Sequence, residues 1–427
     1  MSALKQYQRD LELSVRLGDP TLRLPDQARL LEWVADSLCP PGAPTPSSAE
    51  LMFARWKPGT AILGSWRVRF SDNSQRFINW KSYAGNKTRA LGSSMRVDDA
   101  MLNAVSPLAA YAYLPEHSGH LTCFPMDRIL RVAARVLDMR RLGRMLDASG
   151  IWTGKVMRRQ ASSIELLRLK PEHRAVFRLD AKLKNDRQEP RVPAGTCTLA
   201  VRALSPKKAL RVVSNRQSGP SGIFPDLLFF DREQGVLFED WIAGDPVAWN
   251  DFSQAASSAR LLLQLHQPTP FDLPLKHSRF GALELLSRIP MLRHIVDKIP
   301  VLKQTPGTHW IHADFHADQL IRQGRNLRLL DADCVRPGAP EEDFASWVAD
   351  RVQNDPELDT ESAMQPLMEG YSARAAGLNL ELIAKLTSEQ LIQRAAACLR
   401  RLQVDAELNA ARMLERARAI SSETIHR

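Results

Sequence analysis

The residues best suited to chemistry lie together in one short stretch of the chain. His312 and Asp314 come first, and the amide of Gln319 follows five residues after the carboxylate. Two further carboxylates, Asp331 and Asp333, come after a short apolar run. Carboxylate and amide oxygens suit Mg²⁺, a hard cation that prefers oxygen ligands. Phosphoryl transfer needs such ligands together with a base near the accepting hydroxyl, and this stretch supplies residue types for both tasks.

The local pattern around these residues predicts a loop and a hairpin. Polar groups between 312 and 319 would fall on every face of a helix, which argues against a helix core. Residues 326–331 alternate or run apolar after the turn Gln-Gly-Arg, as a strand does. A hairpin of this kind could bring Asp314, Gln319 and Asp331 around one small volume.

The spacing of these residues resembles a known family. The pattern His312-x-Asp-x-His-x-x-Gln319, then Leu-Asp331-x-Asp and Asp343-Phe-Ala, looks like the aminoglycoside phosphotransferase and choline kinase family. The glutamine in the loop resembles the maltokinase-type members. The resemblance covers roughly residues 148–420 and implies a two-lobed protein-kinase-like fold, with ATP and Mg²⁺ as cofactors.

The resemblance also implies roles for single residues. Asp314 would act on the acceptor hydroxyl as the catalytic carboxylate, and His312 would brace the catalytic loop beside it. Gln319 and Asp331 would bind the metal. Asp333 would serve substrate or metal, Asp343 would be a structural brace, and His316 has no assigned role.

In the small lobe, the resemblance implies a nucleotide site with departures from the family. The segment Glu239, Asp240, Trp241 and Ile242 matches the hinge, whose backbone would hydrogen-bond adenine. Arg202 stands where the family carries a lysine for the phosphates, and arginine is not an equivalent substitution. The turn between Lys170 and Arg174 has no glycine, although its basic residues could still face phosphates. No partner glutamate is found between 203 and 223.

An apparent internal repeat precedes the motif. In each copy a Glu-Leu strand ends in Lys-Pro, at Lys57-Pro58 and at Lys170-Pro171, and a second strand follows. A further strand and a hairpin then complete each copy, and Lys81 occupies in the first copy the place of Arg202 in the second. We interpret the copies as two related sheet domains; a generic likeness between two β-meanders is the alternative.

The element order predicts an α+β protein with sheets first and helices after. We expect the following domains: a helical extension and Pro-rich linker at 1–48, a small-lobe-like repeat at 49–147, a kinase-like N-lobe at 148–243, and a helical C-lobe with the catalytic loop at 244–427. Two longer helical patterns are noted, a basic one at 131–144 and an amphipathic one at 388–420.

Composition narrows the functional classes. The 427 residues carry a formal net charge of +10, which fits a phosphate-bearing ligand, an anionic surface or nucleic acid. No zinc-finger spacing or aromatic ribonucleoprotein motif favours nucleic acid. The apolar runs are too short for a membrane span, no signal-peptide core is found at the N-terminus, and the five cysteines are scattered, so we expect a cytoplasmic protein with reduced thiols.

Three functions therefore stay open at this point. The first is a kinase that phosphorylates a hydroxyl of a sugar, an aminoglycoside or an amino alcohol. The second is a pseudokinase or nucleotide-binding module, suggested by Arg202 and the missing glutamate. The third is a zinc hydrolase using His309, His312, Asp314 and His316. The acceptor and the oligomeric state are not predicted.

Overall fold

The computed structural model describes residues 22–84, 108–185, 195–274, 280–297, 306–355, 357–371, 377–403 and 405–425. These residues divide into two compact units. The first holds two sheets and the second is mainly helical. The chain passes between the units within residues 209–210, 226–227, 241–242, 399–400 and 404–405. Residues 1–21 of the predicted helical extension lie outside the described part.

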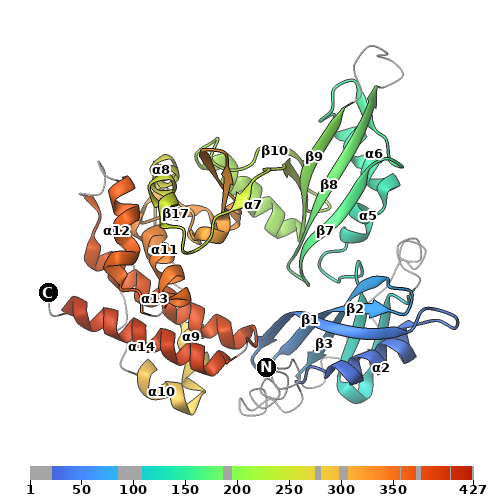
Figure 1. Ribbon diagram of the computed structural model, residues 1–427, viewed down its shortest axis with the longest axis horizontal. Coiled ribbons are helices and arrows are strands. Elements are labelled where there is room, and N and C mark those ends of the chain that lie inside the picture. Colours follow the sequence, from blue (N-terminus) through green and yellow to red (C-terminus); the bar gives the residue numbers. More distant parts are fainter. Residues whose placement is uncertain are drawn as a thin grey trace. The chain divides into compact units, whose positions relative to one another are not determined.

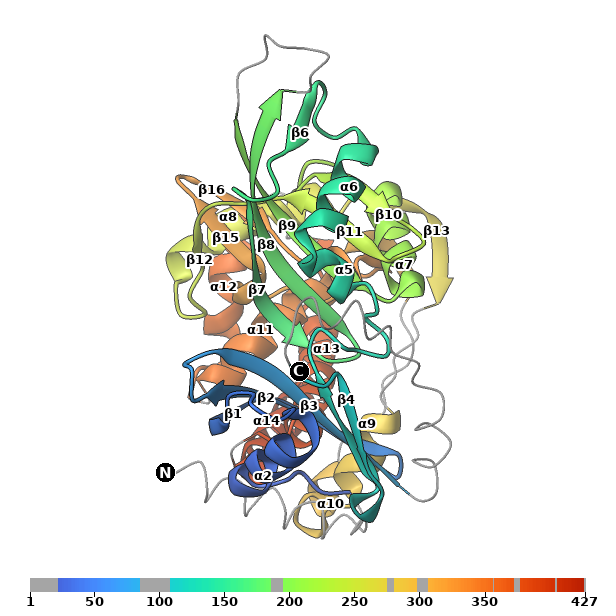
Figure 2. The same ribbon diagram turned by 90° about the vertical axis from the view of Figure 1, so that its right-hand side faces the viewer.

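The first sheet has the strand order β1-β2-β3-β5-β4 and is antiparallel throughout. Helix α2 packs beside it (Figure 2), with Leu30, Val34 and Leu38 buried at a spacing of four residues. These elements span α2 Gln27–Leu38, β1 Pro46–Lys57, β2 Ala61–Phe70, β3 Gln75–Tyr83, β4 Tyr111–Leu114 and β5 Gly119–Cys123.

The second sheet follows two short helices and has the order β10-β11-β9-β8, with β7 and β6 both pairing to the long strand β8. Helices α5 and α6 lie against one face of this sheet (Figure 1), where Phe177, Val201 and Leu142 share one buried core. The elements are α5 Ala133–Leu137, α6 Met139–Ser149, β6 Lys155–Met157, β7 Ser163–Lys170, β8 Arg174–Asn185, β9 Thr196–Leu204, α7 Pro206–Ser218, β10 Leu227–Asp231 and β11 Val236–Asp240.

The two sheets share strand order and register. Counted from the first strand of each, the order is first, second, third, fifth and fourth, taking β7 as the first strand of the second sheet. Lys57 pairs with Ala61 across the first turn, as Lys170 pairs with Arg174. Lys81 on the third strand lies opposite Leu63, two residues after Ala61 on β2. Arg202 likewise lies opposite Val176, two residues after Arg174 on β8. This agreement favours a true repeat over a generic likeness between meanders.

The second unit contains the predicted catalytic stretch. Strand β14 (Pro306–Ile311) leads into it, and β15 (Leu320–Gln323) and β16 (Asn326–Leu329) form the predicted hairpin. The other elements are β12 Asp245–Pro246, η2 Phe252–Gln254, α8 Ala255–Leu265, β13 Pro268–Pro274, α9 Phe280–Ser287, α10 Pro290–Val296, η3 Ala317–Gln319, η4 Ala332–Cys334, β17 Arg336–Gly338, α11 Glu341–Asn354, α12 Thr360–Tyr371, α13 Leu380–Arg400 and α14 Ala406–Ile425.

Two helical predictions need correction. The basic segment 131–144 is not one helix, because Asp138 ends α5 in an extended conformation and caps α6 through its side chain. The amphipathic stretch 388–420 is divided between α13 and α14, since Leu402 and Asp405 adopt the left-handed conformation, which interrupts a right-handed helix.

The α+β class is confirmed, and the two large sheets come before the helices α8 to α14, although α2, α5 and α6 precede or separate these sheets and β13 to β17 lie among the later helices. Among the described residues, no helix is both long and apolar enough to cross a membrane. The domain boundaries after residues 48, 147 and 243 stay predictions.

Candidate functional site

The loop after β14 is held through its backbone by one buried carboxylate. The amide of His312 donates to Asp343 Oδ2 at 2.8 Å, and the amide of Ala313 donates to Asp343 Oδ1 at 2.8 Å. Ala313 has a φ of 60°, a conformation that alanine rarely adopts. Because both carboxylate oxygens accept from successive amides, Asp343 fixes the loop in this conformation.

Asp343 is itself anchored by a histidine at the end of α8. Its Oδ2 lies 3.0 Å from His266 Nε2, and His266 Nδ1 lies 2.9 Å from the hydroxyl of Tyr371 on α12. The side chains of His266 and Asp343 are fully buried. Buried polar groups of this kind are stable only when they are hydrogen-bonded, so three elements of the second unit jointly support the loop.

His312 is placed as a support and not as a reacting group. Its side chain is buried, and its Nε2 lies 2.9 Å from the carbonyl oxygen of Leu330, the residue before Asp331. The amide of Leu330 donates to the carbonyl oxygen of Gln319 at 2.7 Å. These two contacts tie the start and the end of the loop to the residue that precedes Asp331.

Asp314 carries an accessible carboxylate on this loop. Its side chain is 51% exposed, and its Oδ1 lies 3.7 Å from His316 Nε2. Partial burial would raise the pKa of Asp314, but the nearby imidazole of His316, followed by that of His312, outweighs burial and lowers it. Asp314 is therefore ionised at neutral pH and able to accept a hydrogen bond from a hydroxyl.

His316, which received no role from the sequence, connects Asp314 to Gln319. Its Nε2 lies 3.1 Å from the side-chain nitrogen of Gln319 as well as near Asp314. The Gln319 amide can donate to this nitrogen only when it carries no proton, and the nitrogen can donate towards Asp314 only when it does, so His316 serves one of the two residues at a time.

The predicted metal ligands lie at the ends of the hairpin. Gln319 ends the turn η3 before β15, while Asp331 follows β16 in the left-handed conformation, with a φ of 56°. The backbone bond from Leu330 to Gln319 makes the two positions neighbours across the hairpin. Their oxygen donors fit Mg²⁺, which is typically bound by one or two protein side chains plus phosphates and water. Asp333 is buried within η4.

Arg202 has a partner that the sequence did not suggest. Its Nη1 lies 3.5 Å from Glu239 Oε1, and the two side chains are 8% and 6% exposed. The residues lie on neighbouring strands, β9 and β11. The segment after β9 contains no glutamate up to residue 223, but the neighbouring strand β11 supplies one. The carboxylate of Glu239, expected at a hinge, is thus engaged with the cation of its own sheet.

The other predicted nucleotide residues are spread over the second sheet. Lys170 and Arg174 pair across the β7–β8 turn. Asp240 ends β11, and the Trp241 ring lies 5.2 Å from the guanidinium of Arg178 on β8. The division between the units falls between Trp241 and Ile242.

The zinc alternative gains no geometric support. His312 directs Nε2 to a carbonyl oxygen, and His309 Nδ1 lies 2.9 Å from the hydroxyl of Thr308. Within the described residues, no group of three histidine, cysteine, aspartate or glutamate side chains is arranged to hold a metal ion.

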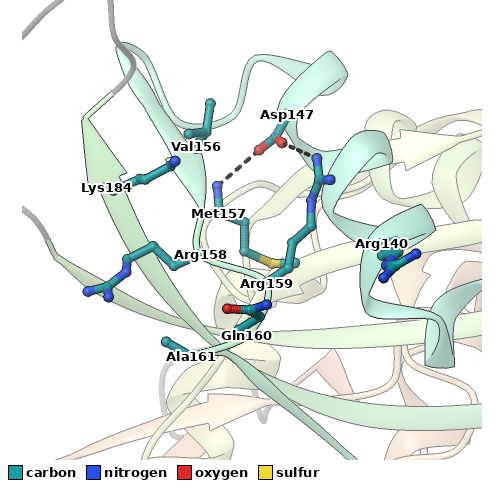
Figure 3. A pocket seen from close by; sticks show the side chains of 9 residues that line it. All are labelled: Arg140, Asp147, Val156, Met157, Arg158, Arg159, Gln160, Ala161 and Lys184. Carbon is teal, nitrogen blue, oxygen red and sulfur yellow. Dashed lines mark hydrogen bonds and ion pairs between the residues drawn. The ribbon is translucent and has the colours of Figure 1, made fainter.

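A cavity of about 580 Å³ lies elsewhere in the first unit, beside α6 and β6 (Figure 3). Asp147 accepts there from the amide of Met157 at 3.0 Å and pairs with Arg159 at 3.2 Å. Arg140, Arg158 and Lys184 on its rim are exposed. None of the predicted site residues lines this cavity.

Comparisons with known proteins find likeness only among solved structures. No family model matches, and no curated protein matches. A choline kinase from Cryptosporidium parvum Iowa II is 12% identical, with a TM-score of 0.47 over 63% of this chain and 92% of that chain. A choline kinase from Streptococcus pneumoniae is 11% identical, with a TM-score of 0.44 over 66% and 99%. A spectinomycin phosphotransferase in complex with ADP and spectinomycin is 13% identical, with a TM-score of 0.41 over 66% and 98%.

Proposed function

We propose that the protein transfers the γ-phosphoryl group of ATP to a hydroxyl of a small molecule, in the class of sugars, aminoglycosides and amino alcohols. The supporting observation is the loop from His312 to Gln319, which presents an ionised, accessible Asp314 on a backbone fixed by Asp343. The pattern of this loop resembles that of small-molecule kinases.

In this proposal Asp314 accepts a hydrogen bond from the acceptor hydroxyl and orients its oxygen towards the γ-phosphorus. A bond forms between that oxygen and phosphorus while the bond from phosphorus to the β,γ-bridging oxygen breaks, which leaves ADP. The hydroxyl proton passes to the Asp314 carboxylate. His316, 3.7 Å from Asp314, lowers the pKa of this carboxylate and so favours its ionised form before the reaction.

Gln319 and Asp331 would hold the metal. Mg²⁺ bound there would neutralise negative charge on the phosphates. The chain's own contribution is to position these two ligands. The contacts of Leu330 with His312 and Gln319 hold the positions of Gln319 and Asp331 next to each other. Lys170, Arg174 and Arg202 of the first unit would bind the phosphates, and the backbone of residues 239–242 would bind adenine.

A transfer screen tests this function. Purified protein with Mg²⁺ and γ-labelled ATP is incubated with sugars, amino alcohols and aminoglycosides, and labelled product is separated from free phosphate. We expect one acceptor class to be labelled by the wild type and none by Asp314→Ala. Label in the same product from both proteins would contradict the role of Asp314.

One observation favours a second candidate, a nucleotide-binding module without transfer activity. The cation at the lysine position is an arginine, and its side chain is only 8% exposed, which leaves little of the guanidinium open to phosphates. A thermal shift with ATP and Mg²⁺, but no labelled product over the full acceptor panel, would favour the module over the kinase.

A further inference from the structure

The first sheet contains a lysine at the position that Arg202 occupies in the second sheet. Lys81 lies opposite Leu63 on β2 and His120 on β5, as Arg202 lies opposite Val176 on β8 and Leu237 on β11. A lysine at this place of a small lobe would be expected to contact phosphates. In the first sheet, however, the ammonium group is already engaged.

The partner of Lys81 is Glu172, at the tip of the β7–β8 turn of the second sheet. Lys81 Nζ lies 2.7 Å from Glu172 Oε1 and 2.6 Å from Oε2, and the two side chains are only 10% and 12% exposed. Arg128 adds a second cation, with Nε 3.7 Å from Oε1. Burial would raise the pKa of Glu172, but the charges of Lys81 and Arg128 outweigh burial and lower it, so the carboxylate is ionised.

The backbone amide of Glu172 is also held, by a residue from the segment that follows the first sheet. Its amide donates to Asp127 Oδ2 at 2.7 Å, and Asp127 Oδ1 accepts from the amides of Ile129 and Leu130 at 2.8 Å each. Asp127 is 5% exposed, so this anchor is rigid. It belongs to the segment that follows β5, which connects the first sheet to α5.

Glu172 needs such support because of its backbone conformation. Its φ is 57°, in the left-handed region where a residue with a side chain is strained. The turn Lys170-Pro-Glu-His-Arg174 has no glycine to adopt that conformation freely. Within the turn itself, the amide of His173 donates to the carbonyl oxygen of Lys170 at 3.0 Å. The remaining support comes from Lys81, Arg128 and Asp127, outside the second sheet.

We propose that the first sheet acts as a clamp on the second: Lys81 and Asp127 hold Glu172 so that the β7–β8 turn, with Lys170 at its start, is presented in a fixed geometry to the nucleotide phosphates. Lys81 is then a positioning residue and not a phosphate ligand. The inference rests on the proposed function for its nucleotide readout, but the holding of the turn can be measured without nucleotide.

The test uses the full chain and three variants. Lys81→Met leaves the Glu172 carboxylate buried and unpaired, which is destabilising in itself. The double variant Lys81→Met/Glu172→Gln removes both charges, so the fold should regain most of its thermal stability while the turn is released. Arg67→Met is the matched control, since it removes the exposed pair of Arg67 with Glu50 at 3.7 Å in the same sheet without touching the turn.

Hydrogen exchange without nucleotide is the first readout. We expect the amides of Glu172 and His173 to exchange at least about tenfold faster in the double variant than in the wild type or in Arg67→Met, because one charge-assisted restraint is lost. Unchanged exchange of these amides in the double variant would overturn the clamp.

Nucleotide kinetics are the second readout. We expect the KM for ATP to rise roughly tenfold in the double variant, with kcat within about twofold of the wild type, since the reacting residues are untouched. A wild type that binds no nucleotide would refute the proposed function, and the exchange result would still decide the clamp. A wild type that binds nucleotide, with an unchanged KM in the double variant, would overturn the clamp alone.

Discussion

At the scale of single residues, the neighbour His316 lowers the pKa of Asp314. The imidazole lies 3.7 Å from the carboxylate and also contacts the Gln319 side chain. The proximity of this imidazole lowers the pKa of Asp314 against the effect of partial burial. A histidine that seemed without function in the sequence is therefore expected to tune the proposed base.

Replacement of His316 should move the acid limit of activity. A general base loses activity as pH falls through its pKa, and His316→Ala removes the main cause that lowers the pKa of Asp314. We expect the acidic limb of kcat/KM against pH to shift to higher pH in this variant. His117→Ala, in the first unit, is the control and should leave that limb in place. Superimposable limbs for His316→Ala and the wild type would contradict the assignment.

His120 should make the first sheet sensitive to acid. It is 7% exposed, and burial, followed by the charge of Lys81, lowers its pKa to about 4. A histidine with a folded pKa below its unfolded value binds fewer protons when folded, so stability falls as pH drops from about 6.5 to about 4. The free energy of unfolding should fall by about 3 kcal/mol over this pH range.

Urea unfolding across this pH range checks the contribution of His120. His120→Gln should be less stable than the wild type at neutral pH, but it should lose less stability on acidification. Parallel pH profiles of the two proteins would show that another group causes the acid sensitivity.

At the scale of elements, one carboxylate on α11 connects three segments. Asp343 accepts from the loop amides of His312 and Ala313 and contacts His266 at the end of α8. His266 in turn contacts Tyr371 on α12. The catalytic loop is therefore supported by helices and does not depend on its own short-range contacts.

Removal of this carboxylate should destabilise the second unit. Asp343→Ala leaves two buried amides and His266 without their acceptor, so we expect a loss of about 3–5 kcal/mol in the free energy of unfolding. Glu284→Ala is the control, because it breaks an exposed pair with Arg288 at 2.7 Å that should contribute less than about 1 kcal/mol. Similar losses in both variants, measured by chemical denaturation, would refute the central place of Asp343.

The break between α5 and α6 provides a second test at this scale. Asp138 accepts from the amides of Arg140 and Arg141 at 2.9 and 3.2 Å, so Asp138→Ala should cost about 1 kcal/mol as a lost helix cap. Asp36→Ala, on the exposed face of α2, should change stability by less than about 0.5 kcal/mol. Equal denaturation midpoints for Asp138→Ala and the wild type would contradict the capping role.

At the scale of the whole molecule, features set by residues close in sequence could be predicted, whereas pairings between residues far apart in sequence could not. Alternating residues and turns predicted the hairpins of both sheets and the loop at Asp314, because these depend on neighbours in sequence. The pair Lys81–Glu172 joins residues 91 positions apart, and Arg202–Glu239 depends on the order of strands in the sheet. Neither pairing leaves a local signal in the sequence, so the pairing of Arg202 with Glu239 could not be predicted from it.

The repeat was visible in sequence, but its consequence was not. Lys-Pro at the end of the first strand and a basic residue on the third strand occur in both copies. The register agrees with the equivalence of Lys81 and Arg202 that the sequence predicted, but only the fold brings Glu172 to Lys81. In this proposal the second sheet binds the nucleotide, and the first sheet supports the β7–β8 turn of the second sheet.

The most direct measurement compares wild type and Asp314→Asn in two assays on the same preparations: binding of ATP with Mg²⁺, and transfer of labelled γ-phosphate to the acceptor found in the screen. The variant removes the charge at the exposed end of a loop that Asp343 holds by its backbone, so the fold should persist. We predict nucleotide affinity within about threefold of the wild type and a fall in transfer of at least about a hundredfold, the typical contribution of a positioned general base. Equal transfer by the two proteins would contradict the assignment of Asp314 and the catalytic account built on it.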